Sequence, residues 1–276
     1  MNPHDLYERS VTNPAALVAF ILAAYSEGST HNPKVLREDF SGSAALAKHF
    51  AASSRARRAI AVDCDPIPLA QAAGPRMTLV LADVLEANDR ADIIAATNFA
   101  LGYWHSRDAL ITYLRHARGH LARRGLFLAD IYGGHTALRT GSWTRTIRHP
   151  DLGTFLYRWN QREADPTTGL VRNSIDFGLT THAKQKSTKR SATKSARAIE
   201  WTNDAFTYHW RLWSMPELRD ALAEAGFKQI DFYDSLGDAL DHRGNAYIRP
   251  LRPEPASKGI GIPMDRDWVV YAVARS

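Results

Sequence analysis

Short apolar runs alternate with longer amphipathic segments from Lys34 to Gly134. This order is typical of βαβ units that build a parallel sheet, because the strands of such a sheet are buried on both faces. The predicted strands are Pro33–Leu36, Ala59–Asp63, Met77–Leu81, Asp92–Ala96 and Leu126–Ile131. The clearest helix begins after Ser106, ends before Gly125, and carries one apolar face that consists of Leu110, Leu114, Ala117 and Leu121.

After Gly134 the pattern changes to a period of two, which predicts an antiparallel hairpin of Thr154–Glu163 and Leu170–Leu179. Ala205–Leu212 extends this hairpin into a small sheet. Ser214 then caps a helix, Met215–Ala225. Two further strands follow, Gln229–Tyr233 and the closing strand Asp267–Ala274. The predicted domains are therefore a Rossmann-like core over residues 1–141, an inserted antiparallel β lid over 142–213, and the rest of the core over 214–276.

Composition indicates an ordinary globular protein of 276 residues, with 45% hydrophobic and 23% charged residues. Cys64 is the single cysteine, so the chain has no internal disulfide, and we expect a reducing, cytoplasmic setting. The apolar run Ala15–Ala24 is too short to span a membrane. It follows Asn13 and Pro14, which predict the start of a buried helix. We therefore expect a soluble protein.

The net charge of +6 comes from one short segment. The Lys-rich loop, residues 181–198, holds six basic side chains and no acidic one, and the other 29 basic residues equal the 29 acidic ones. A solvated insertion explains this loop, whereas an RNA-binding enzyme is expected to spread basic residues over its cleft. The neutral remainder favours a small-molecule substrate over nucleic acid. The sequence leaves open whether the chain is a monomer or a homodimer.

Acidic residues stand at the ends of three successive predicted strands. Glu38 and Asp39 precede the small-residue turn around Gly42, Asp63 ends the next strand, and Asp83 follows the third. Asp63 comes 21 residues after Gly42, a spacing at which a carboxylate accepts hydrogen bonds from both hydroxyls of a ribose. Because the carboxyl ends of parallel strands meet at one edge, these acids surround a single crevice.

The order of these segments resembles that of class I S-adenosylmethionine-dependent methyltransferases, over nearly the whole chain. The resemblance implies a seven-stranded, mainly parallel sheet with an antiparallel last strand, and S-adenosylmethionine as cofactor. It places Glu38 at the acidic position of the first motif, and Gly42 and Ser43 at the methionyl part of the cofactor. Asp63 corresponds to the ribose-binding acid and Asp83 to the acid beside the adenine. The implied cofactor-binding residues are Glu38, Gly42, Ser43, Asp63, Cys64, Asp83, Val84 and Asn98.

The first motif departs from the usual pattern, since Phe40 and Ala44 stand where glycine is common. We therefore expect a loop of different shape. The run Arg37–Ser43 resembles a variant of this motif in a subgroup that also has an Asp-Leu-Tyr-Glu start, here Asp5–Glu8, and a Tyr-x-Trp-Arg-x-Trp run, here Tyr208–Trp213.

A sulfonium methyl is already activated, so such an enzyme mainly aligns a nucleophile and excludes water. A neutral amine reacts without a base, whereas a hydroxyl needs a proton acceptor. Candidate catalytic residues in the cleft are Tyr132, His105 and Tyr7. Candidate substrate-binding residues are Tyr7, Trp104, Trp210 and Arg211, although Trp210 and Arg211 could equally pack the small sheet onto the core.

Three other functions remain as alternatives. An RNA methyltransferase would use the Lys-rich loop, and a cofactor-binding protein without catalysis would fit the changes at Phe40 and Ala44. An NAD(P)-dependent oxidoreductase is disfavoured because the Gly-x-Gly-x-x-Gly motif is missing. His116 and His120 are one helical turn apart, but no cysteine or acid accompanies them, so no metal site is expected.

Overall fold

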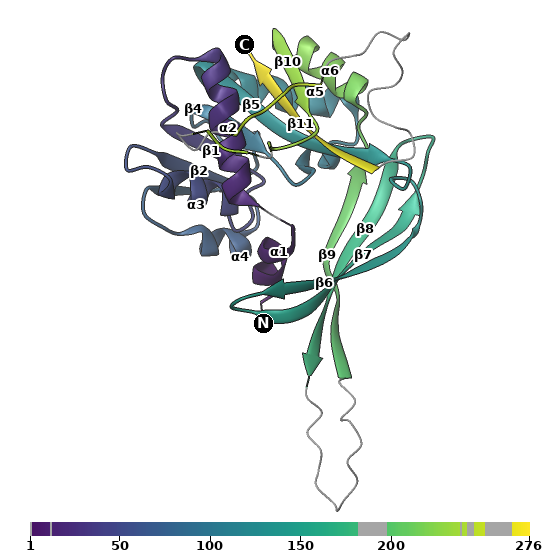
Figure 1. Cartoon of the computed structure of the whole chain (residues 1–276). Coiled ribbons are helices and arrows are strands. Elements are labelled where there is room, and N and C mark those ends of the chain that lie inside the picture. The colour runs from purple at the N-terminus through teal and green to yellow at the C-terminus, as the bar shows by residue number, and fades with distance from the viewer. Residues whose placement is uncertain (1, 12, 182–197, 238, 242–245, 252–266) are drawn as a thin grey trace, which may run out of the picture. The chain divides into compact units, whose positions relative to one another are not determined.

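The computed structural model describes all residues except 1, 12, 182–197, 238, 242–245 and 252–266 (Figure 1). The chain forms two compact units. The core unit comprises Val11–Ala137 and Trp210–Ser276, and the lid unit comprises Met1–Ser10 and Leu138–His209. The first ten residues thus belong to the lid unit, whereas the sequence-based division placed them with the core. Nearly all of the Lys-rich loop lies outside the described residues.

The core unit is built on a seven-stranded sheet in the order β10-β11-β5-β4-β1-β2-β3. Its strands are β1 (Val35–Asp39), β2 (Arg58–Asp63), β3 (Met77–Leu81), β4 (Ala91–Ala96), β5 (Leu121–Gly134), β10 (Gln229–Tyr233) and β11 (Asp267–Arg275). β1 to β5 pair in parallel, and β11 runs antiparallel to both of its neighbours. This sheet confirms the predicted Rossmann-like fold class.

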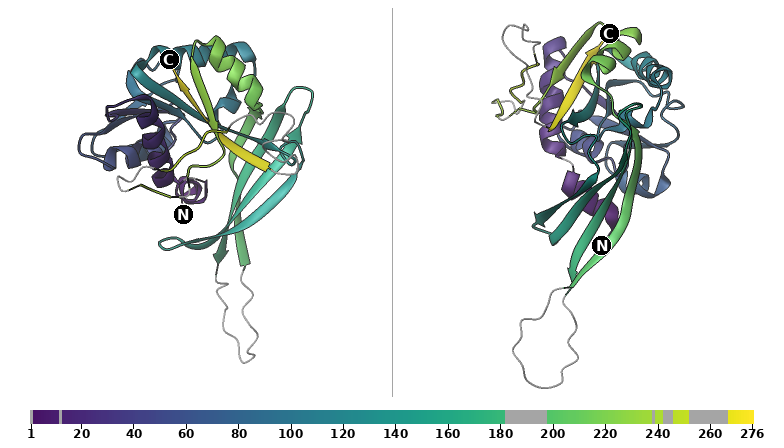
Figure 2. Two further views of the ribbon diagram at one scale, coloured as in Figure 1. Left: turned by 45° about the horizontal axis from the view of Figure 1, so that its top comes forward. Right: turned by 90° about the vertical axis from the view of Figure 1, so that its right-hand side faces the viewer.

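Helices cover both faces of this sheet (Figures 1 and 2). α2 (Pro14–Gly28) and α3 (Ala45–Ala52) bury apolar residues on one face, and α5 (Arg107–Gly119) and α6 (Met215–Glu224) bury theirs on the other. Three of these helices begin with predicted caps: the Asn13 side chain accepts from Ala16 N, Ser106 accepts from Ala109 N, and Ser214 forms a capping box with Glu217. Short helices α4 (Pro66–Leu69), η1 (Ala70–Ala72) and η2 (Ala100–Tyr103) connect the strands.

The lid unit is a four-stranded antiparallel sheet in the order β6-β7-β8-β9, with one N-terminal helix (Figure 2). Its elements are α1 (Pro3–Val11, whose last residue belongs to the core unit), β6 (Gly141–His149), β7 (Gly153–Ala164), β8 (Leu170–Thr181) and β9 (Ala198–Arg211, which continues into the core unit). Within the lid unit, Tyr7 of α1 packs against Phe206 of β9, with ring centroids 4.9 Å apart. The predicted hairpin is thus confirmed as β7 and β8.

Three sequence predictions about these elements were wrong. β6 was missed, because most of its side chains are exposed and no apolar alternation marks it. The first strand lies at Val35–Asp39 rather than Pro33–Leu36, because it includes three charged residues that are buried. α5 ends at Gly119, so Leu121, although in phase with the helical face, begins β5.

Among the described residues, none of the helices has the length and apolar character needed to cross a membrane.

Candidate active site

The loop after β1 has an unusual backbone. Phe40, Gly42 and Ala44 have φ angles of 55°, 51° and 55°, in the left-handed region that favours glycine. Phe40 and Ala44 therefore adopt the glycine conformation without being glycine. The expectation that these two residues change the shape of the loop stays a prediction, and the structure adds that both adopt a φ that glycine reaches at little cost.

Asp63 at the end of β2 joins this loop to the next one. One carboxylate oxygen, Oδ2, accepts from Gly42 N at 2.6 Å, and the other, Oδ1, accepts from Asp65 N at 2.8 Å. Asp65 in turn caps α4 by accepting from Ile67 N. Asp63 is half-buried, and each of its oxygens keeps acceptor capacity for a further donor.

Glu38 is buried and caps the helix that follows the loop. α3 begins after Ala44, whose side chain makes no capping hydrogen bond, and Oε2 of Glu38 accepts from Ala47 N at 2.8 Å instead. A buried carboxylate thus satisfies a helix N–H that would otherwise be orphaned. Glu38 therefore holds the start of α3 in place beside the loop.

Asp83 and Asn98 lie after β3 and β4, at the same edge of the sheet. Asp83 is exposed and its Oδ1 accepts from Leu85 N, while the next residue, Val84, is buried. Asn98 and Phe99 both have positive φ, 59° and 64°. The structure thus brings Gly42, Asp63, Asp83 and Asn98 to the carboxyl ends of four neighbouring parallel strands.

An acid that the sequence analysis missed holds the turn at Asn98. Asp130 of β5 is buried, and its two oxygens accept from Asn98 N (3.2 Å) and Phe99 N (2.8 Å). Burial raises the pKa of this carboxyl to about 6, although the two backbone donors act in the opposite direction. The signal in the sequence was a lone acid inside the apolar run Leu126–Ile131.

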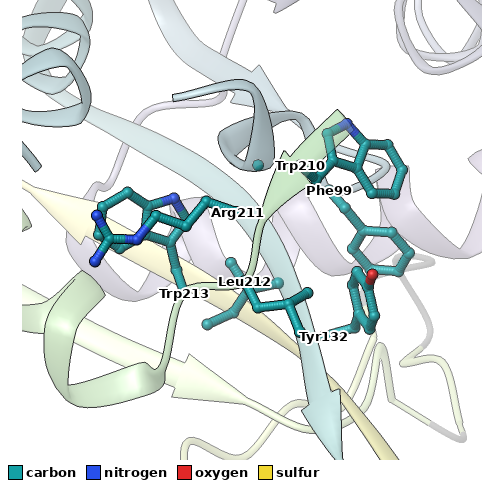
Figure 3. A pocket seen from close by; sticks show the side chains of 8 residues that line it. Phe99, Tyr132, Trp210, Arg211, Leu212 and Trp213 are labelled. Carbon is teal, nitrogen blue, oxygen red and sulfur yellow. The ribbon is translucent and has the colours of Figure 1, made fainter. Parts of the chain in front are cut away.

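A small aromatic pocket, with a cavity volume of about 10 Å³, lies beside this turn, entirely within the core unit (Figure 3). The ring of Phe99 lies 4.7 Å from that of Tyr132 and 6.1 Å from that of Trp210. The full lining is Phe99, Gly102, Ile131, Tyr132, Trp210, Arg211, Leu212 and Trp213. Within the part of the chain that the structure describes, this lining includes no Asp, Glu, His or Lys side chain.

The guanidinium of Arg211 contacts Trp213 and His105. It lies 3.9 Å from the ring centre of Trp213 and donates to the carbonyl of His105 at 3.1 Å. Figure 3 shows Arg211 and Trp213 together, on the side of the chain away from Trp210. His105 itself is exposed. These contacts favour a packing role for Arg211 over the binding of an anionic substrate.

The other predicted site residues lie apart from the pocket lining. Trp104 stacks on Tyr113 at 5.3 Å and contacts Phe40 at 6.3 Å, so its ring packs against the core. Tyr7 belongs to the lid unit. Cys64 is exposed next to Asp63, and Ser43 follows Gly42 in the loop.

His116 of α5 and His120, which directly follows the helix, hydrogen-bond to backbone carbonyls. Nε2 of His116 lies 2.9 Å from Ala87 O, and Nδ1 of His120 lies 2.8 Å from His116 O. Because a carbonyl only accepts, each of these nitrogens carries the proton. Among the described residues no group of three or more His, Cys, Asp or Glu side chains could hold a metal ion.

Several solved structures match the fold of this protein over nearly the whole chain. An S-adenosylmethionine-dependent methyltransferase from Clostridium acetobutylicum is 16% identical, with a TM-score of 0.65, and the match covers 98% of this chain and 96% of that one. DesVI from Streptomyces venezuelae is 12% identical, with a TM-score of 0.66 and coverages of 97% and 94%. The fold is that of S-adenosylmethionine-dependent methyltransferases.

A third structure with this methyltransferase fold is CalS10, an amino pentose methyltransferase from Micromonospora echinaspora, which was solved with S-adenosylmethionine bound. It is 13% identical, with a TM-score of 0.65, and the match covers 99% of this chain and 95% of that one. No protein-family model matches the sequence, and no curated protein matches it.

Proposed function

We propose that this chain is an S-adenosylmethionine-dependent methyltransferase that acts on a small molecule in the cytoplasm. The observation that carries the proposal is the hydrogen bond from Gly42 N to Asp63, because it joins the left-handed loop after β1 to the acid that ends β2 within a methyltransferase fold. A carboxylate at the end of the second strand is where a nucleoside ribose is bound in nucleotide-binding α/β folds.

The residues present fit the cofactor. A Cβ built on Gly42 meets no atom within 4 Å, so the space over the loop is open to a ligand. Oγ of Ser41 is buried and has no hydrogen-bond partner among the described residues, so a polar ligand atom could satisfy it. Gly42 and Ser43 would contact the methionyl part, Asp63 and Cys64 the ribose, and Asp83 and Val84 the adenine. Asn98 would face both cofactor and acceptor, while Glu38 would hold α3.

When bound, the cofactor supplies an electrophilic methyl group on a sulfonium. The chain then needs to orient the acceptor atom in line with the methyl–sulfur bond, at a distance of about 3 Å, and to exclude water. We assign this task to the aromatic pocket, with Tyr132 and Trp210 as its walls. The Tyr132 hydroxyl is the polar group that could hold an acceptor through a hydrogen bond.

We propose an amine as the acceptor. Among the described residues that line the pocket, none is an Asp, Glu, His or Lys that would serve as a general base, and a neutral amine needs none. An apolar environment also favours the neutral form of an amine over the charged one. CalS10, which shares the fold, methylates an amino pentose, in keeping with an amine on a small polar molecule. Oxygen methylation is the alternative, with Tyr132, His105 or Tyr7 as the proton acceptor.

Ligand-induced stabilisation tests the cofactor. Thermal unfolding is followed with S-adenosylhomocysteine, S-adenosylmethionine and NADPH in parallel, for the wild type and for Asp63→Ala. A ligand at 100 times its Kd stabilises a protein by about 2.7 kcal/mol, which raises the Tm by several degrees. We expect such a shift with both sulfur nucleosides, and its loss in Asp63→Ala. A shift with NADPH alone would contradict the proposal in favour of an oxidoreductase.

Transfer of a labelled methyl group then tests catalysis. The protein is incubated with methyl-labelled S-adenosylmethionine and matched amino and hydroxy sugars, and label is counted in the product. We expect label on the amino compounds, with kcat reduced no more than about threefold in Tyr132→Phe, because a neutral amine requires no base. Label on the hydroxy compounds, with activity lost in Tyr132→Phe, would establish oxygen methylation. Cofactor binding without transfer to any acceptor would support a non-catalytic binding protein.

A further inference from the structure

A buried ion pair on β1 lies next to the loop that joins β3 to β4. Arg37 and Asp39 are two residues apart on β1, so they lie on the same face of the sheet, and they are 0% and 1% exposed. Nε of Arg37 is 2.8 Å from Oδ1 of Asp39, and Nη2 donates to Oδ2 at 3.1 Å. The hydroxyl of Tyr113 also donates to Oδ2, at 2.9 Å. Each charge thus has an opposite charge beside it, and Oδ2 of Asp39 accepts two hydrogen bonds, whereas an isolated charge in the core would be costly.

The remaining arm of the guanidinium holds the loop. Nη1 of Arg37 donates to the carbonyl of Ala87 at 2.9 Å and to that of Asp89 at 3.1 Å. Nε2 of His116 donates to the same Ala87 carbonyl, and Ala87 is buried. Arg37 thus joins β1 to the loop of residues 82–90 through the two hydrogen bonds of Nη1, while Nη2 and Nε face Asp39.

The same loop carries the acid assigned to the adenine. Asp83 begins a tight turn in which Glu86 N donates to Asp83 O at 2.9 Å, and Leu85 N donates to its side chain at 2.8 Å. The turn leads directly into Ala87, where Arg37 holds the chain. At the other end, Ala82 N donates to Asp63 O at 3.1 Å. Asp83 therefore lies on a short turn with both ends fixed, one of them by Arg37.

We propose that Arg37 is a positioning residue that makes the site selective for a 6-aminopurine. Held by this turn, the Asp83 carboxylate accepts from a purine 6-amino group and disfavours a 6-oxo group, which presents an acceptor instead of a donor. Arg37 touches neither ligand nor acceptor and acts through the loop. This inference rests on the proposed cofactor site.

The test compares two ligands that differ at the 6-position alone. Kd is measured by calorimetry for S-adenosylhomocysteine and S-inosylhomocysteine, with wild type, Arg37→Lys, and the double variant Arg37→Met with Asp39→Asn. Lysine keeps the charge beside Asp39 but cannot span Asp39 and both carbonyls. The double variant removes both charges, so it leaves no unpaired buried charge. Arg76→Lys is the matched control, because Arg76 also donates to two backbone carbonyls, those of Ala51 and Arg57, at the opposite edge of the sheet.

We expect the wild type and Arg76→Lys to prefer the adenosyl ligand at least tenfold, and both Arg37 variants to reduce this preference to threefold or less. Their affinity for the inosyl ligand should stay within threefold of wild type, which a general loss of structure would not allow. A full tenfold preference in a folded Arg37 variant would overturn the inference, and so would a wild type without preference. If the wild type bound neither nucleoside, the proposed function itself would fail.

Discussion

Oδ2 of Asp63 lies 2.6 Å from the backbone nitrogen of Gly42, and this hydrogen bond joins the ends of β1 and β2. One carboxylate therefore fixes a glycine loop through its backbone while its free acceptor positions remain available to a sugar hydroxyl. The loop and the acid form one unit before any ligand arrives, which reduces the ordering that binding requires.

Replacing Asp63 by Asn tests this double role. The change removes the negative charge and leaves one acceptor oxygen, so we expect the Kd for S-adenosylhomocysteine to rise at least tenfold, equal to about 1.4 kcal/mol. Asp65→Asn is the matched control, because asparagine is as good a helix cap as aspartate. Titration calorimetry of both variants measures the effect. Equal affinities in Asp63→Asn and wild type would exclude Asp63 from the ligand site.

The backbone of Gly42 predicts a specific difference between two glycine substitutions. Gly42 has a φ of +51°, whereas the φ of Gly119, the last residue of α5, is not positive. At both positions an added Cβ would meet no atom within 4 Å. We expect Gly42→Ala to lower the free energy of unfolding by about 1 kcal/mol and Gly119→Ala to raise it by about 0.5–1 kcal/mol. Urea denaturation measures both. Destabilisation of the same size in the two variants would rule out the left-handed conformation as the cause.

Asp130 predicts a pH dependence of stability. Its pKa of about 6 in the folded protein lies above the value near 3.9 of an unfolded chain, so between these values the folded state binds more protons. The stabilisation is complete well below pH 4 and is lost as the pH rises from about 4 through 6. We expect the free energy of unfolding of wild type, minus that of Asp130→Asn, to fall by about 2 kcal/mol from pH 4 to 7.

Urea denaturation at several pH values checks this expectation. The subtraction removes the titration of every other group that the substitution leaves unchanged. A difference that stays constant, or that grows with pH, would show that Asp130 is not a buried acid with a raised pKa.

The Lys-rich loop distinguishes the small-molecule enzyme from an RNA methyltransferase. Removing residues 184–197 deletes its six basic side chains, and we expect methyl transfer to a small acceptor to stay within about twofold of wild type. Filter binding to RNA at increasing salt provides the second measurement. Salt-sensitive RNA binding that disappears with the deletion would favour the RNA enzyme, because phosphate contacts make binding depend on salt.

Some of the fold follows directly from sequence patterns, and some depends on contacts between distant residues. β3 and β10 lie at their predicted positions because local apolar runs define them. Arg37 and Asp39 made the predicted end of β1 wrong. Charges usually mark the end of a buried strand, and here they pair with each other inside it. Asp130 is similar, since its partners, Asn98 and Phe99, lie more than thirty residues away.

The backbone of Phe40 could not be predicted from residue preferences. A large side chain disfavours positive φ by roughly 1–2 kcal/mol, so the sequence indicated a changed loop. In the structure its ring packs against Tyr103 and Tyr113, at 5.9 and 5.7 Å, and these contacts offset the strain. Phe40 thus combines a positive φ with aromatic packing that a glycine would lack.

The lid unit is assembled from two stretches at different places in the chain, Met1–Ser10 and Leu138–His209. Transplanting the 138–209 segment alone into another enzyme of this fold would leave Phe206 without Tyr7 and His4, which pack against its ring. A recombination experiment that aims to exchange the whole lid unit would therefore need three crossover points, one of them within the first dozen codons of the gene.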